Sequence, residues 1–240
     1  MSVYVSSDLH GDLIKFKSLL KLINFQVNKD ILYVLGDVLD RGPKGIELLS
    51  YIREYSDGDN SVIQIIKGNH ELFAEMYIEG KLTKDNWIKW GGKQTATQID
   101  QMTEGERLDL LAYLKSLQHY AVIERENGLD WVLSHSGIYL DFLVEDENGI
   151  DVVRSIKEAI ANNEFEYLIT NDLIYAPRSV LDRLNRYLVI GHIPVIFMND
   201  GSNQIIKRKQ YMCLDTGAGY RNLGGKMSIY RLEDGKEFYL

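Results

Sequence analysis

Three short apolar runs alternate with amphipathic stretches at the start of the chain. The runs read VYVSS, ILYVLGD and VIQIIKGNH, and each has the length of a buried strand. Between the first two, apolar residues from Leu13 to Ile23 recur at the spacing of one helix face. Residues 44–55 follow Pro43, which suits the first turn of a second helix. This order favours parallel strands joined by right-handed crossovers, and therefore an α/β fold.

The rest of the chain predicts a helical segment followed by further strands. Residues from about 72 to 117 read as mostly helical, with a break at Gly91 and Gly92. Strand-like runs then return as YAVIE, LDWVLSH, YLVIGH, YMCLD and MSIYRL, and their alternation favours antiparallel or mixed pairing. Asp234-Gly235 predicts a hairpin turn near the end. Because the sequence has no internal repeat and no flexible linker, we expect residues 1–240 to form a single domain.

Composition excludes several classes of protein. The formal net charge is −8, so we expect no nucleic-acid partner and no membrane partner. No apolar run approaches the roughly 18 residues that span a bilayer, and the N-terminus lacks the pattern of a signal peptide. The single cysteine, Cys213, cannot form an intrachain disulfide, which favours a reducing, cytoplasmic setting.

Polar side chains follow five of the predicted strands at the point where each strand ends. The first three runs end in Asp8 and His10, in GDVLDRG and in GNHE, and two later runs end in His135 and His192. Ligand sites of open α/β sheets lie beyond the carboxyl ends of strands, so we expect these side chains to converge. Four of the five histidines lie at such ends, and only His119 does not. A structural role explains one histidine well, but a cluster of this kind indicates a metal or catalytic site.

The donor types indicate which metal chemistry this site would perform. The four histidines join Asp8, Asp37 and Asn69, with no thiolate among them. Mixed oxygen and nitrogen donors suit Mn, Fe or Zn better than a closed structural zinc site. A single catalytic metal ion that keeps coordination positions open for its substrate uses fewer ligands than this. They suit two divalent ions that share a bridging carboxylate and together activate a phosphoryl group and a water nucleophile.

Five motifs in order resemble those of the metallophosphoesterase (calcineurin-like) superfamily, and within it the PPP-type serine/threonine protein phosphatases of bacteria and phages. The motifs are SDLHG, GDVLDRG, GNHE, SHSG and GHIP, followed by LDTGAGY and GGKMSIY near the C-terminus. The family usually has glycine where Ser7 stands, and serine is also small. The resemblance implies two mixed β-sheets in a central sandwich flanked by helices, with a dinuclear metal site at the strand ends.

The family pattern also implies a role for each motif residue, carried over position by position. Two divalent ions, Mn²⁺ first and Fe or Zn as alternatives, are the implied cofactors. The implied ligands are Asp8 and His10 for the first ion, Asp37 as the bridge, and Asn69, His135 and His192 for the second.

Catalytic roles follow from the same resemblance. His70 resembles the general acid that protonates the leaving alkoxide, with Asp40 as its orienting partner. Arg41 resembles a clamp on phosphate oxygens, and Asn69 is also expected at the phosphate. Arg178, in DLIYAPRSV, is the candidate second clamp. The family more often has an aromatic, one residue and then arginine, so a solvated arginine is the alternative there.

Three functions fit this set of residues. The preferred one is a protein serine/threonine phosphatase, in which a hydroxide held between the metals attacks phosphorus in line. The second is hydrolysis of a phosphorylated small molecule, as in symmetrical diadenosine tetraphosphate hydrolases, which usually read GNHD where this chain reads GNHE. The third is a non-catalytic phosphate-binding scaffold, which the intact His70 and Asp40 disfavour. The expected partner is thus a phosphoprotein or a phosphorylated small molecule.

Several neighbouring residues have two interpretations on sequence alone. Glu71 either supports the site or favours the start of a helix, and Asp12 is best read as a helix N-cap. Trp87 and Trp90 either line the substrate cleft or pack in the core. Gly191 precedes a ligand residue and either permits close backbone approach or forms a tight turn.

Overall fold

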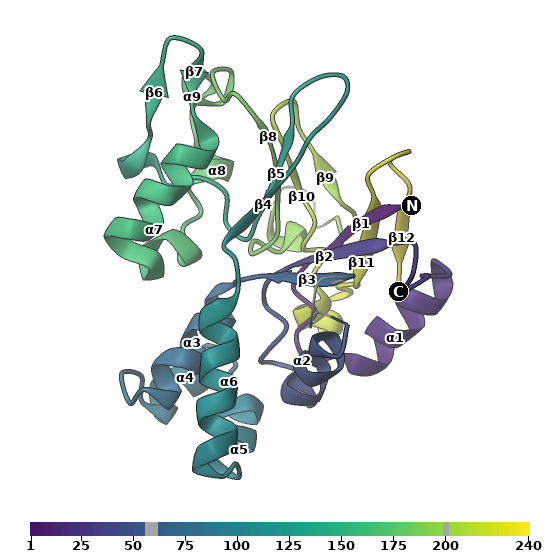
Figure 1. Cartoon of the computed structure of the whole chain (residues 1–240), viewed down its shortest axis with the longest axis vertical. Coiled ribbons are helices and arrows are strands. Elements are labelled where there is room, and N and C mark those ends of the chain that lie inside the picture. The colour runs from purple at the N-terminus through teal and green to yellow at the C-terminus, as the bar shows by residue number, and fades with distance from the viewer. Residues whose placement is uncertain (56–61, 199–201) are drawn as a thin grey trace.

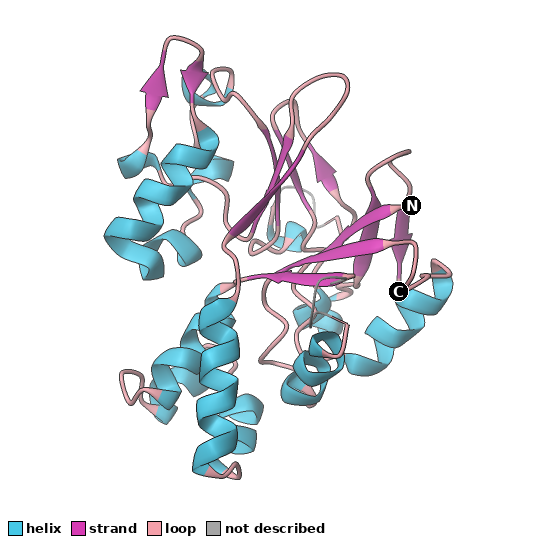
Figure 2. Ribbon diagram, in the orientation of Figure 1, coloured by secondary structure: helices cyan, strands magenta, loops and turns pink. Residues whose placement is uncertain are grey.

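The computed structural model describes residues 1–55, 62–198 and 202–240, and these form two five-stranded mixed sheets with helices around them (Figures 1 and 2). The first sheet has the order β12-β11-β1-β2-β3 and the second β4-β5-β8-β10-β9. An apolar layer that includes Val5 and Leu35 from the first sheet and Leu133 and Val189 from the second packs between them. The expected sandwich of two mixed sheets flanked by helices is therefore confirmed.

The first sheet holds the predicted parallel start of the chain. Strands β1 (Val3–Ser6), β2 (Ile31–Leu35) and β3 (Ile63–Ile66) run parallel, and helices α1 (Leu13–Leu22) and α2 (Gly45–Arg53) connect them. Ser6 pairs with Val34, and Val34 with Ile65, so the three strands end at the same edge. Antiparallel β11 (Ser228–Arg231) and β12 (Glu237–Tyr239) complete the sheet, and their hairpin turns at the predicted Asp234-Gly235.

The second sheet contains four of the strand-like runs from the later half of the chain. Parallel pairing joins β5 (Trp131–Ser134), β8 (Tyr187–Ile190) and β10 (Tyr211–Cys213). The edge strands β4 (Tyr120–Ile123) and β9 (Ile206–Lys207) are antiparallel to their neighbours. The ends of β5 and β8 therefore lie together, which brings His135 and His192 to one region.

Helices cover the outer faces of both sheets (Figure 1). The segment after β3 forms α3 (Asn69–Ile78), α4 (Lys84–Lys89), α5 (Lys93–Asp100) and α6 (Glu104–Ser116). The second sheet is flanked by α7 (Val152–Ile169), with α8 (Asp172–Tyr175), α9 (Arg178–Leu181) and the small hairpin β6 (Glu145–Asp146) and β7 (Gly149–Ile150). Short 3₁₀ turns lie at Leu140–Phe142, Val195–Phe197 and Ala218–Leu223. Among the described residues, no helix is both long and apolar enough to cross a membrane.

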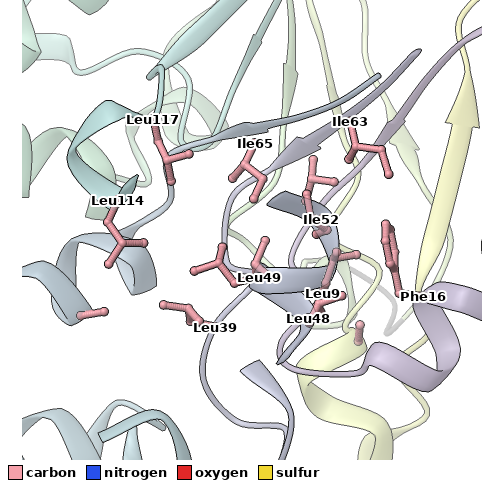
Figure 3. Close-up of a cluster of buried hydrophobic side chains, with 14 of the residues drawn as sticks. Leu9, Phe16, Leu39, Leu48, Leu49, Ile52, Ile63, Ile65, Leu114 and Leu117 are labelled. Atoms are coloured by element: carbon pink, nitrogen blue, oxygen red, sulfur yellow. The ribbon is translucent and has the colours of Figure 1, made fainter. Parts of the chain in front are cut away.

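Apolar burial beneath the first sheet fixes the loops that carry the site. Figure 3 shows this cluster, in which Leu9 and Leu39 come from the loops themselves. They pack with Phe16 of α1 and Leu48 of α2, and all four side chains are fully buried. Asp12 caps α1 by accepting a hydrogen bond from the Lys15 backbone N–H at 3.0 Å, as its sequence position predicts. Each loop is therefore anchored by its own buried leucine.

Candidate metal centre

The backbone at the strand ends adopts conformations that side chains rarely favour. Among the described residues, seven other than glycine have positive φ. Asn24 is one, and the other six are Asp8, His10, Asp37, Asp40, Arg41 and His192. Such conformations cost roughly 1–3 kcal/mol each and concentrate at functional sites. The strain therefore marks six of the residues that the sequence singled out.

Hydrogen bonds between adjacent loops hold these conformations. After β1 and β2, the backbone N–H of Asp8 donates to Gly36 at 3.1 Å and that of His10 to Asp37 at 2.9 Å. The His192 N–H, after β8, donates to the Asp8 carboxylate at 3.0 and 3.2 Å. A Cβ at Gly191 would overlap Asp8 Oδ2, so close approach, and not merely a turn, requires glycine there.

Glu71 supports the same loops from beneath. Its Oε2 accepts hydrogen bonds from the N–H groups of Asp37 at 2.8 Å and Gly68 at 3.0 Å. Its Oε1 accepts from Val38 at 2.9 Å and Leu39 at 3.2 Å. Burial, and then the charge of Asp37, raises the pKa of Glu71 to about 7. The structure shows both roles that the sequence left open, because Glu71 also bonds the Gly68 N–H that precedes the first turn of α3.

Asp37 lies between two groups of side chains. Its Oδ2 is 3.7 Å from His70 Nε2 and 4.0 Å from His10 Nε2. Its Oδ1 is 3.5 Å from His135 Nε2. Burial alone would raise the pKa of Asp37, but four imidazoles, His135 foremost, outweigh it and lower the pKa. Each oxygen thus faces a different set of nitrogens, as a bridging carboxylate requires.

The histidine nitrogens are oriented by partners outside the centre. His10 Nδ1 lies 3.1 Å from the Leu39 carbonyl, and His135 Nδ1 lies 2.8 Å from the Leu35 carbonyl. A ring that donates from Nδ1 keeps the lone pair of Nε2 for another ligand. Burial lowers the pKa of both histidines, which favours the neutral ring that a metal ligand requires.

Asn69 joins the second group from the start of α3. Its Oδ1 lies 2.8 Å from His135 Nε2 and 3.0 Å from His192 Nδ1. Burial, and then His135, lowers the pKa of His192 to about 3. Neutral imidazoles beside an amide oxygen form the donor set expected for the second metal.

His70 is held by an acid on its far side. Its Nδ1 lies 2.5 Å from Asp40 Oδ2, which also accepts a hydrogen bond from Trp87 Nε1 at 2.7 Å. Burial alone would lower the pKa of His70, but Asp37 and Asp40 outweigh it and raise the pKa. Thr95 Oγ1 accepts from the Asp40 N–H at 3.1 Å. The buried Trp87 therefore supports the site from the core.

A cavity of about 700 Å³ opens over these side chains. Its wall includes Arg41, Asn69 and His70, with the half-exposed Trp90 at its edge. The Arg41 guanidinium carbon lies 4.4 Å from the centre of the Tyr220 ring. Its buried Nε has no hydrogen-bond partner within the described parts of the chain. The guanidinium is therefore available to an anion in the cavity.

Arg178 is not brought into this arrangement. It lies exposed at the start of α9, and the charge interaction that involves it is with Asp182. It does not belong to the described residues that line the cavity. The two arginines proposed from the sequence therefore occupy different environments, with Arg41 alone beside His70.

Two contributing residues could not be assigned from the sequence. Burial, and then Asp37, raises the pKa of Asp215 to about 7. Asp215, in the turn after β10, in turn raises the pKa of the buried Asp8. Tyr220, which supports Arg41, also comes from the C-terminal part of the chain. The motif LDTGAGY contains both residues, but it specifies no partner for either.

The donor set fits divalent cations. His10, Asp37 and His70 place possible ligand atoms within 4.8 Å of one another, and so do Asp37, His135 and His192. Asp8 lies outside these two groups and contributes a buried carboxylate whose pKa burial raises well above its usual range. Buried carboxylates beside neutral imidazoles require a positive partner, and metal ions supply one.

Comparison with known proteins places this site in a family. The model of a family described as calcineurin-like phosphoesterase matches residues 1–208. A protein of Psychromonas ingrahamii named bis(5'-nucleosyl)-tetraphosphatase, symmetrical, is 26% identical over 71% of this chain and 56% of its own length. The protein of that name from Buchnera aphidicola is 23% identical over 90% of this chain and 70% of its own length. This chain thus spans little more than half of the first relative.

The fold is shared with solved structures at lower identity. A protein serine/threonine phosphatase from Saccharomyces cerevisiae superposes with a TM-score of 0.65 at 14% identity, over 100% of this chain and 79% of that one. At this identity the likeness shows the fold alone. Because the family model covers most of the sequence, the chain belongs to the calcineurin-like phosphoesterase family.

Proposed function

We propose that this chain is a metal-dependent phosphoesterase whose substrate is a symmetrical dinucleoside tetraphosphate. The observation that carries the proposal is the position of Asp37, whose two oxygens face separate sets of imidazole nitrogens at 3.5 to 4.0 Å. A pair of cations bound there would activate both the phosphoryl group and a water nucleophile. The proposed ligands are Asp8, His10 and Asp37 for one cation, and Asp37, Asn69, His135 and His192 for the other.

The remaining residues have roles at the phosphate. His70, held at Nδ1 by Asp40, donates a proton to the leaving oxygen. Arg41 lies free in the cavity to bind phosphate oxygens, and its contact with Tyr220 limits its motion. Asn69 lines the same cavity. These groups orient the phosphate and stabilise the charge that moves to the leaving group.

One observation supports a dinucleotide over a phosphoprotein, and a second weakens the sequence argument for a phosphoprotein. Both relatives described above are named as symmetrical bis(5'-nucleosyl)-tetraphosphatases. The sequence preference for a phosphoprotein relied in part on GNHE in place of GNHD, and hence on Glu71. Glu71 is fully buried, and its oxygens accept from backbone N–H groups of the loops. That residue does not touch the substrate cavity, so it gives little reason to prefer a phosphoprotein.

Hydrolysis of phosphoserine or phosphothreonine remains the second candidate because the ordered motifs resemble those of protein phosphatases. A panel on the Mn²⁺-loaded protein separates the candidates. It compares diadenosine tetraphosphate, a phosphopeptide, a simple aryl phosphate and a cyclic nucleotide. We expect the highest kcat/KM on diadenosine tetraphosphate. Preference for the phosphopeptide would support the second candidate, and inactivity on all four with metals bound would support the scaffold.

A further inference from the structure

A second cavity adjoins the one above the metal centre. It measures about 560 Å³ and is lined by Tyr175, Phe197 and Arg208, among others. We call it the Arg208 cavity, and the cavity of about 700 Å³ the Trp90 cavity. Asn171 and His192 line both, so the two cavities meet at a proposed metal ligand. Both volumes lie within the roughly 300–1,000 Å³ typical of ligand sites.

Each cavity presents aromatic surface to solvent. In the Trp90 cavity, Trp90 is 43% exposed, and its ring lies 4.8 Å from the ring of Phe73, tilted by 35°. In the Arg208 cavity, Tyr175 is 77% exposed and Phe197 is 59% exposed. Exposed aromatic faces are the platforms on which nucleic-acid bases stack.

An edge-to-face contact also links the two cavities. The ring of Phe197, in the Arg208 cavity, lies 4.9 Å from that of Tyr220, in the Trp90 cavity, at 84°. Tyr220 in turn contacts the Arg41 guanidinium. Tyr220 therefore connects Arg41 with an exposed ring of the other cavity.

The charge of the walls suits a polyanion. The chain has 35 acidic residues and a net charge of −8, yet no described residue that lines either cavity is acidic. The Trp90 cavity includes Arg41 and Lys89, and the Arg208 cavity includes Arg208. Locally positive walls on an acidic protein provide the attraction that a chain of phosphates requires.

Building on the proposed function, we infer that the two cavities bind the two nucleosides of one dinucleoside tetraphosphate. One base stacks on Trp90 and the other on Tyr175, the more exposed ring of the Arg208 cavity, and the phosphates cross between them at His192. Hydrolysis at the centre of the phosphate chain then leaves one nucleoside diphosphate in each cavity. This arrangement gives a physical reason for symmetrical cleavage.

The test compares diadenosine tetraphosphate with adenosine tetraphosphate, which keeps the phosphates but has one nucleoside. The wild-type protein is expected to show a KM about tenfold lower for the dinucleotide, since stacking contributes strongly to binding. Trp90→Ala and Tyr175→Ala should each remove this preference, because one effective nucleoside site then remains for both substrates. Tyr175→Phe, which keeps the ring, should restore it. Leu108→Ala, an exposed position on α6 outside both cavities, is the matched control.

Tryptophan fluorescence provides a readout that does not require turnover. Trp87 and Trp131 are buried, so Trp90 is the exposed tryptophan of the three. Adding adenosine diphosphate to the metal-loaded protein should quench this emission, and Trp90→Phe should remove the response. Normal dinucleotide cleavage with an unchanged KM ratio in Trp90→Ala and Tyr175→Ala would overturn the inference and leave the proposed function standing. Cleavage of a phosphopeptide but not the dinucleotide would instead overturn the proposed function.

Discussion

His70 is held in one orientation by two carboxylates. Its Nδ1 contacts Asp40, and its backbone N–H donates to Asp37 Oδ1 at 3.1 Å. The ring's Nε2 is therefore directed toward the centre, 3.7 Å from Asp37 Oδ2. This placement suits proton transfer to a leaving oxygen.

His70→Asn is expected to keep two metals bound and to lower kcat by about 10²–10⁴-fold. The loss should be larger on an alkyl phosphate than on an aryl phosphate, because an alkoxide leaving group needs the proton more. Metal analysis and turnover on both substrates check this. If the variant keeps its metals and turns over the alkyl phosphate as fast as the parent protein, another group transfers the proton.

The two candidate arginines lie in different environments, and their substitution separates them. Arg41→Ala should lower kcat/KM by about tenfold or more, because a charged hydrogen bond to phosphate contributes ~1.5–3 kcal/mol. Arg178→Ala, at an exposed position outside the cavity, should match the parent protein in both kcat and KM. A raised KM in Arg178→Ala would restore it as the second clamp.

At the scale of single residues, the sequence predicts the positions that a local motif specifies. Asp8, His10 and Asp37 each follow a strand directly, so a local pattern predicts where they lie. Glu71 contacts Val38 across 33 residues, and Tyr220 contacts Arg41 from the other end of the chain. Such partners depend on how the loops pack, and no local pattern specifies them.

At the scale of elements, the start of α3 supports the loop after β2 through Glu71. Glu71→Asp shortens this side chain and should weaken metal affinity by about 10–100-fold, as for other partners of metal ligands. At saturating Mn²⁺, the variant should prefer the dinucleotide over the phosphopeptide by the same ratio of kcat/KM values as the parent protein. A ratio that moves strongly toward the dinucleotide would show that this position selects the substrate.

An ion cluster connects α3 with α7. Lys67 Nζ lies 2.7 Å from Glu75 and 3.0 Å from Glu164, and His119 Nε2 lies 2.7 Å from Glu164. The hydrogen bond from His119, and then the charge of Lys67, lowers the pKa of Glu164 to about 2. The histidine left out of the metal centre therefore has a structural partner.

This pKa shift makes the contribution of Glu164 to stability depend on pH. Because the folded pKa lies below the unfolded value, ionised Glu164 stabilises the fold above about pH 4.3. That stabilisation is lost as pH falls toward about 2.

Glu164→Gln should lower the free energy of unfolding by ~1–2 kcal/mol at neutral pH, with the difference vanishing in acid. Urea unfolding across pH measures this, with exposed Glu158→Gln on the same helix as control. A difference in the free energy of unfolding that does not change with pH would contradict this role of Glu164.

Helix α7 and the β6–β7 hairpin were not predicted from the sequence. Asn163 interrupts α7 with φ −159° and ψ 87°, so the helix is not one continuous run. Strands β6 and β7 have two residues each, too few for a recognisable alternation. The parallel start, by contrast, had full-length apolar runs and was predicted correctly.

At the scale of the whole molecule, the two sheets bring loops from distant parts of the chain to one edge. The βαβαβ order predicts that β1, β2 and β3 neighbour one another. It does not predict that β11 lies beside β1, or that β8 lies between β5 and β10. Those pairings join residues more than 20 positions apart, and the sandwich was expected from family resemblance and not from periodicity.

The most direct test of the proposed chemistry is product analysis of the Mn²⁺-loaded protein acting on diadenosine tetraphosphate. Metal content and nucleotides are measured on the same sample, with nucleotides resolved by ion-exchange chromatography. We predict two metal ions per chain and adenosine diphosphate as the nucleotide product. Adenosine monophosphate with adenosine triphosphate, or no cleavage while a phosphopeptide loses its phosphate at the same metal loading, would contradict it.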